Sequence, residues 1–279
     1  MTKEQINIGI LQSAGIAGRI IETALNNPEI TDVFTPVIYS KENQNDKNVG
    51  SDLKFGNIAA VVVAPGSTTE FSFPGAMMVY ADGSLRFASV SASAEDFSAD
   101  VAADIVRKAW QMLRRDFMVS MPRIALVIPK ESPSQTVDMC KQVVRDLTEQ
   151  GVYVFGPYPA DEYSEDNLLQ NFDISLVVGE KELLDLVQTR TSDMRTRFIA
   201  GMPMIMTQTD YPATFEFAED DLDEPANALR QAAYLAIDIS ANRISYDEAH
   251  ESPLPKLYHE KRDDSEKVRF AIPKKKAEE

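Results

Sequence analysis

The chain has 279 residues, 44% of them hydrophobic, and is long enough to bury one large core or two modest ones. Its 44 acidic residues outnumber the 28 basic ones and give a net charge of -16, which excludes nucleic acid and anionic membranes as expected partners, because both are bound through clustered Lys and Arg. A single cysteine, no apolar run of about 20 residues and no signal-like N-terminus predict a cytoplasmic protein without a disulfide or a membrane span.

Alternating strand and helix patterns begin at the N-terminus. A Gly- and Ala-rich turn containing Gly15 and Gly18 precedes a predicted helix that carries Ile20 and Ile21. The amides at the start of that helix could cradle a phosphate, although a plain tight turn is the commoner explanation. The two glycines are therefore the candidates for a cofactor contact. Strands are predicted at residues 6–11, 33–39, 58–64 and 85–90, with a polar loop at 41–52.

A strand at 124–128 leads into a helix with well-marked ends. Ser132 is predicted to cap this helix, with Pro133 at its first position and Gln135 completing a capping box. Gly151 is predicted to end it. The inward face is expected to carry Val137, Cys140, Val144 and Leu147.

The loop ahead of that helix, residues 129–134, is the first candidate site. In parallel α/β sheets, ligands bind in the loops that leave the carboxyl ends of strands. Lys130 and Glu131 lie in this loop, which contains no histidine. Asp161, after the next predicted strand, is a helix cap or a ligand.

Two further helices are predicted, at residues 97–117 and 225–239. An acidic run at 219–224 precedes the second helix; the helix dipole stabilises such carboxylates, and the run lacks the spacing of a calcium loop. The two histidines, His250 and His259, are interpreted as solvated tail residues rather than a metal pair. The residues of the first helix expected to face the core are Val101, Ile105, Ala109, Met112 and Leu113.

Several segments resemble one enzyme family. The run Gly-Pro-Tyr-Pro-Ala-Asp at 156–161, Phe-Pro-Gly at 73–75 and Gly-Met-Pro at 201–203, followed by Thr207 and Asp210, are similar to 4-hydroxythreonine-4-phosphate dehydrogenases. The resemblance implies an α/β fold, the two-lobed α/β/α sandwich of isocitrate and isopropylmalate dehydrogenases with a mixed, mostly parallel sheet. It also implies one lobe from residues 1–90 and 213–279, and a central lobe from 91–212 with dimerisation elements.

The same resemblance shows where this sequence departs from the family. The family holds a divalent metal with histidines from two subunits, and Lys130, Glu180 and Tyr211 stand at those three positions. The family's His-Thr-Glu after Phe-Pro-Gly is Ala76-Met77-Met78, of which the methionine pair is expected to fill the core. Because lysine is normally protonated and tyrosine is a weak ligand, the sequence does not favour a divalent metal here.

Two functions from different classes follow. The first is a non-catalytic homologue, a pseudoenzyme, that uses the scaffold to bind a metabolite, such as a phosphorylated small molecule, or a protein partner. The alternative is an active NAD-dependent dehydrogenase, or an enzyme with altered, metal-free chemistry in the same cleft. NAD stays open as a cofactor, and the resemblance implies a homodimer or a heterodimer with a related dehydrogenase. The cleft candidates are Lys130, Glu180, Asp210 and Tyr211.

Overall fold

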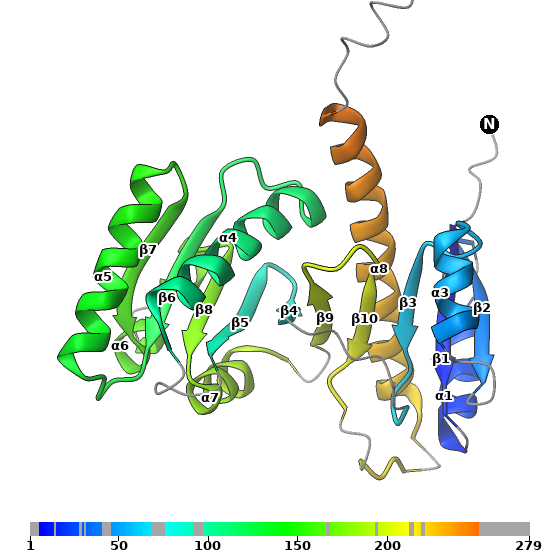
Figure 1. Ribbon diagram of the computed structural model, residues 1–279. Helices are drawn as coiled ribbons and strands as arrows, with labels where there is room; N and C mark the ends of the chain where they lie inside the picture. The colour runs from blue at the N-terminus through cyan, green and yellow to red at the C-terminus, as the bar shows by residue number, and fades with distance from the viewer. Residues whose placement is uncertain are drawn as a thin grey trace, which may run out of the picture.

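A computed structural model describes residues 6–13, 15–27, 30, 32–40, 46–67, 76–91, 97–165, 168–192, 195–211, 215–218 and 221–250. Within these ranges the strands form one sheet, in the order β2-β1-β3-β10-β9-β4-β5-β8-β6-β7 (Figure 1). The strands are β1 (Ile6–Gln12), β2 (Phe34–Ser40), β3 (Ala60–Val63), β4 (Met77–Asp82), β5 (Leu85–Ser91), β6 (Arg123–Ile128), β7 (Tyr153–Pro159), β8 (Ile174–Val178), β9 (Thr196–Ala200) and β10 (Met206–Thr209).

Two parallel blocks of strands make up most of this sheet. One block contains β2, β1, β3 and β10, and the other contains β5, β8, β6 and β7. Antiparallel pairing of β10 with β9, of β9 with β4 and of β4 with β5 joins the blocks. The expected mixed, mostly parallel sheet is therefore confirmed.

Helices cover both faces of the sheet. One face packs against α1 (Ile16–Leu25), α4 (Ala99–Asp116), α5 (Ser134–Glu149) and α8 (Asp223–His250). The other face packs against α3 (Asp46–Lys54) at one end, and against α6 (Ala160–Glu165), the 3-10 turn η1 (Leu168–Asn171) and α7 (Glu180–Arg190) at the other. Successive side chains of a strand point to opposite faces, so Ile124 and Leu126 of β6 join the first core and Ala125 and Val127 join the second. This is the three-layer α/β/α sandwich that the sequence predicts.

Helix α8 ties the two blocks together. It packs against α1 on one side and against α4 on the other, and Figure 1 shows it, coloured yellow to orange, behind β10 and β3. Thr207 of β10 donates to the carbonyl of Ala232, and Arg243 forms an ion pair with Asp116, at 2.7 Å between Nε and Oδ1. Arg243 also donates to the carbonyls of Met202 and Pro203, so its buried guanidinium is well satisfied.

Two predictions, one for the segment that forms α3 and one for α4, are wrong. The polar segment 41–52 was expected to be a loop, but α3 begins at Asp46, and Val49 at its centre is fully buried against β1 and β3. A single fully buried residue among the described side chains of α3 gives no detectable period in a polar stretch. In α4, Val101 is 40% exposed, and Ala102 and Val106 face the core instead.

The start of α5 also differs from its prediction. The hydroxyl of Ser132 donates to the carbonyl of Pro129, which closes the preceding turn and leaves no side-chain cap. The helix begins at Ser134, after Pro133. Gly151 has φ of +82° just beyond the helix, as predicted for its end. The helix predicted at 225–239 is longer than expected, because α8 continues to His250. No strand was predicted at residues 77–82, where the structure has β4.

The division into lobes at residues 90 and 212 stays a prediction. Strands β9 and β10, from the central segment, pair with β4 and β3 of the first segment. Among the described residues, no helix has the length and hydropathy to cross a bilayer.

The ion pair between Arg243 and Asp116 should dominate the stability of the α4–α8 contact. Its side chains are 10% and 3% exposed, so Asp116→Ala leaves a buried guanidinium without its counter-charge and should cost about 3–5 kcal/mol. The control is Asp247→Ala, which breaks the pair with Arg115 whose side chains are 56% and 41% exposed, and should cost less than about 1 kcal/mol. Urea unfolding followed by circular dichroism measures both, and equal midpoints for the two variants would contradict the expectation.

Candidate functional site

The four cleft candidates all follow strands of the sheet. Lys130 lies in the turn after β6, Glu180 begins α7 after β8, and Asp210 and Tyr211 follow β10. Each of Lys130, Asp210 and Tyr211 has a charged partner of its own, whereas Glu180 lines a cavity. The structure therefore spreads the candidates over several local environments.

Lys130 forms an ion pair with Asp161, with Nζ and Oδ2 separated by 2.6 Å. The hydrogen bond from Lys130 is the main cause that lowers the pKa of the Asp161 carboxyl below its ordinary value. The side chain of Lys130 is 71% exposed, and the pair borders a hollow of about 320 Å³ between α6 and α7. Asp161 is the second residue of α6 and pairs with Lys130, so the predicted cap is wrong, whereas a ligand role stays a prediction.

Glu180 borders a cavity of about 430 Å³. Most of its wall is apolar, and Glu180 is the one carboxylate among the residues that line it. Met77 is buried, as expected of a core residue, whereas Met78 is half-buried and its sulfur lies 3.9 Å from Nε2 of Gln208. The lining residues are Ala76, Met77, Met78, Tyr80, Ser89, Val90, Ile105, Glu180 and Leu183.

Asp210 lies between two arginines that the sequence reasoning missed. Nε of Arg195 is 2.5 Å from Oδ2 of Asp210, and Nε of Arg197 is 3.0 Å from its Oδ1. The Asp210 side chain is only 15% exposed. A signal was present in the sequence, because two arginines flank one threonine at the start of a strand, and alternate positions of a strand face the same side.

Arg197 has few partners for a largely buried guanidinium. Its side chain is 25% exposed, and the pair with Asp210 is its one contact with a charged or hydrogen-bonding group in the described part of the chain. Nε lies near the carboxylate but makes no hydrogen bond there, because the direction of its N–H is unfavourable. Because Nε is buried, the donors of Arg197 that could reach a ligand are those of its two terminal nitrogens.

Sheet register places Arg197 beside the Glu180 cavity. In β4 its opposite residue is Tyr80, and in β10 its opposite residue is Gln208. Tyr80 and Met78 both line the cavity, and Gln208 contacts Met78. A cationic group and an apolar hollow therefore share one face of the central strands.

Tyr211 belongs to an aromatic cluster beside α8. Its ring centroid lies 5.2 Å from that of Phe215 and 5.2 Å from that of Phe217. Its hydroxyl donates to Oε1 of Glu224 at 2.9 Å. Tyr211 is thus a protonated hydrogen-bond donor.

The two candidate glycines shape the turn from β1 into α1. Gly15 has φ of +89°, a conformation that favours glycine. A Cβ at Gly18 would lie 2.6 Å from Nε2 of Gln12 and would displace the end of that side chain. The amide of Ser13 donates to the hydroxyl of Ser67, which joins this turn to the end of β3. The tight turn accounts for both glycines, and a phosphate contact stays a prediction.

The residues present do not fit the family's metal cage. A metal ligand set requires deprotonated donors, but Lys130 is used as the cationic partner of Asp161 and the Tyr211 hydroxyl is used as a donor. Among the described residues, no group of three or more His, Cys, Asp or Glu side chains is placed to hold a metal ion.

The chain is similar in sequence to proteins named 4-hydroxythreonine-4-phosphate dehydrogenase. No family model matches it. The chain is 25% identical to the 4-hydroxythreonine-4-phosphate dehydrogenase of Bacteroides thetaiotaomicron, over 95% of this chain and 83% of that protein. It is 23% identical to the protein of the same name from Zymomonas mobilis, over 70% of this chain and 68% of the relative.

Solved structures share the fold. A putative 4-hydroxythreonine-4-phosphate dehydrogenase from Salmonella typhimurium superposes with a TM-score of 0.64 at 16% identity, over 85% of this chain and all of that one. Isocitrate dehydrogenase from Methylococcus capsulatus superposes with a TM-score of 0.58 at 13% identity, over 87% and 88% of the two chains. The chain is therefore similar in sequence to 4-hydroxythreonine-4-phosphate dehydrogenases and shares the fold of these enzymes and of isocitrate dehydrogenase.

Proposed function

We propose that this protein is a non-catalytic member of its family that binds a small phosphorylated metabolite beside Arg197. The observation that carries the proposal is the Arg197 side chain, three-quarters buried and without a hydrogen bond in the described part of the chain. A guanidinium withdrawn from water needs acceptors, and its planar fork matches the geometry of a phosphate or carboxylate.

The charge around Arg197 supports an anionic ligand. Two guanidiniums, of Arg195 and Arg197, lie against the single carboxylate of Asp210. A phosphate group accepts several hydrogen bonds at once and would pair with the terminal nitrogens of Arg197.

The neighbouring cavity suits the rest of the ligand. Its volume of about 430 Å³ is within the range of small-molecule pockets, and its wall combines Met78, Leu183 and the ring of Tyr80 with Glu180. Glu180 lies among apolar groups and could accept a hydrogen bond from a hydroxyl or amino group. The ligand is therefore a small molecule with an anionic end and a mainly uncharged body.

The pairing of the candidate residues supports binding over catalysis. Lys130 and Tyr211 stand where the family has metal ligands, and both are engaged with carboxylates of this chain. Asp210 is held by two arginines and serves as their anchor. Catalysis on a metal needs a coordination site, and these pairs fill the positions that would provide one.

We also propose that the protein forms a dimer, with itself or with a related dehydrogenase. Several large apolar side chains are exposed on the single chain, among them Phe55 at 73%, Met121 at 62% and Ile244 at 57%. Burying such side chains is a usual driving force for obligate association, which buries about 2,000 Å² or more.

Arg197→Gln tests the binding site directly. The variant keeps a polar side chain but removes the charge, and it should weaken the binding of 4-hydroxythreonine 4-phosphate, phosphoserine or inorganic phosphate by about tenfold or more, because hydrogen bonds to charged groups contribute roughly 1.5–3 kcal/mol. Titration calorimetry gives the affinities, and thermal shift with both nicotinamide cofactors shows whether NAD binds as well. Arg145→Gln, an exposed arginine of α5 bonded to Gln142, is the matched control. Equal affinity of both variants would refute the site.

Dehydrogenation is the second test. With NAD or NADP, 4-hydroxythreonine 4-phosphate and added Zn²⁺, Co²⁺ or Mg²⁺, we expect no reduced nicotinamide above the buffer blank. We also expect no stoichiometric metal by elemental analysis after dialysis against a weak chelator, because Lys130 and Tyr211, at two of the three cage positions, are paired with carboxylates of this chain. Metal-dependent turnover that Tyr211→Ala abolishes would favour the altered-enzyme alternative instead.

Light scattering tests the dimer. At micromolar concentration we expect twice the mass of the 31.0 kDa chain, or a mixed dimer when the cognate dehydrogenase is added. A monodisperse monomer in both measurements would show that the chain does not pair in either way.

A further inference from the structure

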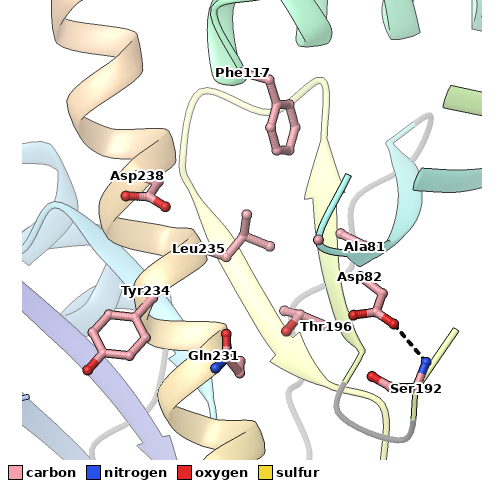
Figure 2. A pocket seen from close by; sticks show the side chains of 10 residues that line it. Ala81, Asp82, Phe117, Ser192, Thr196, Gln231, Tyr234, Leu235 and Asp238 are labelled. Atoms are coloured by element: carbon pink, nitrogen blue, oxygen red, sulfur yellow. Dashed lines mark hydrogen bonds between the residues drawn. The ribbon is translucent and has the colours of Figure 1, made fainter. Parts of the chain in front are cut away.

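A second cavity of about 430 Å³ lies on the opposite face of the central strands, between these strands and α8 (Figure 2). Thr196 and Ala81 form its floor, and both are neighbours in the β9–β4 ladder. Because side chains alternate along a strand, Thr196 faces this cavity and Arg197, the next residue, faces the proposed phosphate site. The two sites are thus separate.

Two carboxylates stand on different sides of this cavity. Asp82 comes from the end of β4 and Asp238 from α8, as Figure 2 shows. The amide of Ser192 donates to Oδ2 of Asp82 at 2.7 Å, which fixes this carboxylate and leaves Oδ1 for other partners. Asp238 has no hydrogen-bond or ion-pair partner within the described ranges, and partial burial raises the pKa of its carboxyl.

The described part of the cavity lining contains no cationic side chain. None of the ten described residues that border the cavity is Lys, Arg or His. A cation bound in the hollow would bring an opposite charge to both carboxylates and favour their ionised forms. The polar side chain of Gln231 lies on the same wall of α8 and offers a further acceptor.

Apolar walls decide which kind of cation fits. In Figure 2, Phe117 and Leu235 point into the space between α8 and the strands. The ring of Phe117 is fixed from outside by the Arg86 guanidinium, 3.9 Å from its centroid, and by Phe198, at 5.6 Å between centroids. Hydrated Mg²⁺ or Ca²⁺ requires a shell of oxygen ligands, whereas an organic cation has methylene groups that pack on such walls.

We propose that this cavity binds a small organic cation, with a primary ammonium or guanidinium group bound by Asp82 and Asp238 and its carbon chain lying against Phe117 and Leu235. A cationic group at each end of an aliphatic chain would give each of the two carboxylates its own partner. The ligand class is therefore that of aliphatic diamines and guanidino-amines. This site does not depend on the phosphate site or on the catalytic state of the protein.

Titration calorimetry on the full chain with 1,4-diaminobutane and with agmatine tests the proposal. We expect saturable one-to-one binding, weakened about tenfold by Asp238→Asn and by Asp82→Asn, since each removes one charge-assisted hydrogen bond. Asp238 lies on the surface of α8 and its variant should fold normally, which circular dichroism checks. No measurable heat with either amine would overturn the proposal, as would equal binding of the neutral analogue 1,4-butanediol.

Matched controls separate a site from general attraction to an acidic protein. Asp138→Asn removes one exposed charge of α5, far along the chain from the cavity, and should leave amine binding unchanged. Equal weakening by Asp138→Asn and Asp238→Asn would mean non-specific attraction and would overturn the site. If MgCl₂ displaces the amine more strongly than NaCl does at the same ionic strength, the cavity is a divalent-cation site, and the amine proposal is overturned. Arg197→Gln should not change amine binding, so failure of either proposed site is recognised separately.

Discussion

The antiparallel centre of the sheet, β9 paired with both β4 and β10, is the constraint on which the two candidate sites depend. It joins two parallel blocks into one sheet, and its ladder sets which side chains share a face. Thr196 and Arg197 are consecutive residues, so the pleat sends one to the α8 side and the other to the opposite side. A slip of one residue in this register would exchange the two faces and destroy both sites. The ion pair of Arg243 and Asp116 supports the register indirectly, because Arg243 also binds the carbonyls of Met202 and Pro203 in the turn between β9 and β10.

Elements with a strong hydrophobic period could be predicted from the sequence, and those formed by few buried residues could not. The strands around Ile8, Val62 and Ile124 are nearly continuous apolar runs, and each is confirmed. Helix α3 was missed because its burial rests mainly on Val49 in a polar segment. The cap at Ser132 failed for another reason. A hydroxyl can close a turn or cap a helix, and the local sequence permits both, so the choice is made by the tertiary position of the Pro129 turn.

The candidate site, too, could be predicted from the sequence only in part. Resemblance identified the positions after β6, β8 and β10 where the family places its chemistry, and the fold puts Lys130, Glu180 and Asp210 at those strand ends. The sequence did not identify the partners of these residues: the Arg-Thr-Arg pattern places two arginines on one side of a strand but does not point to Asp210. Asp161 follows a different strand from Lys130, and Arg195 and Arg197 lie on a neighbouring strand to Asp210. Contacts between strands that are adjacent in space but distant in the chain carry no local pattern, and the functional meaning of Arg197 arises wholly from such contacts.

The overall negative charge of the chain disfavours an anion at the phosphate site and favours a cation at the amine site. A net charge of -16 repels an anion at long range and attracts a cation, but screening limits this field to about 8 Å at physiological ionic strength. At contact distance the groups within the site decide the affinity, so Arg195 and Arg197 can still select a phosphate. The overall field then acts mainly on association rates, which it lowers for the anion and raises for the amine. Added salt weakens both effects. The same acidic surface that argued against nucleic acid as a partner is therefore compatible with a phosphate site, because that site is small, partly buried and carries its own positive charge.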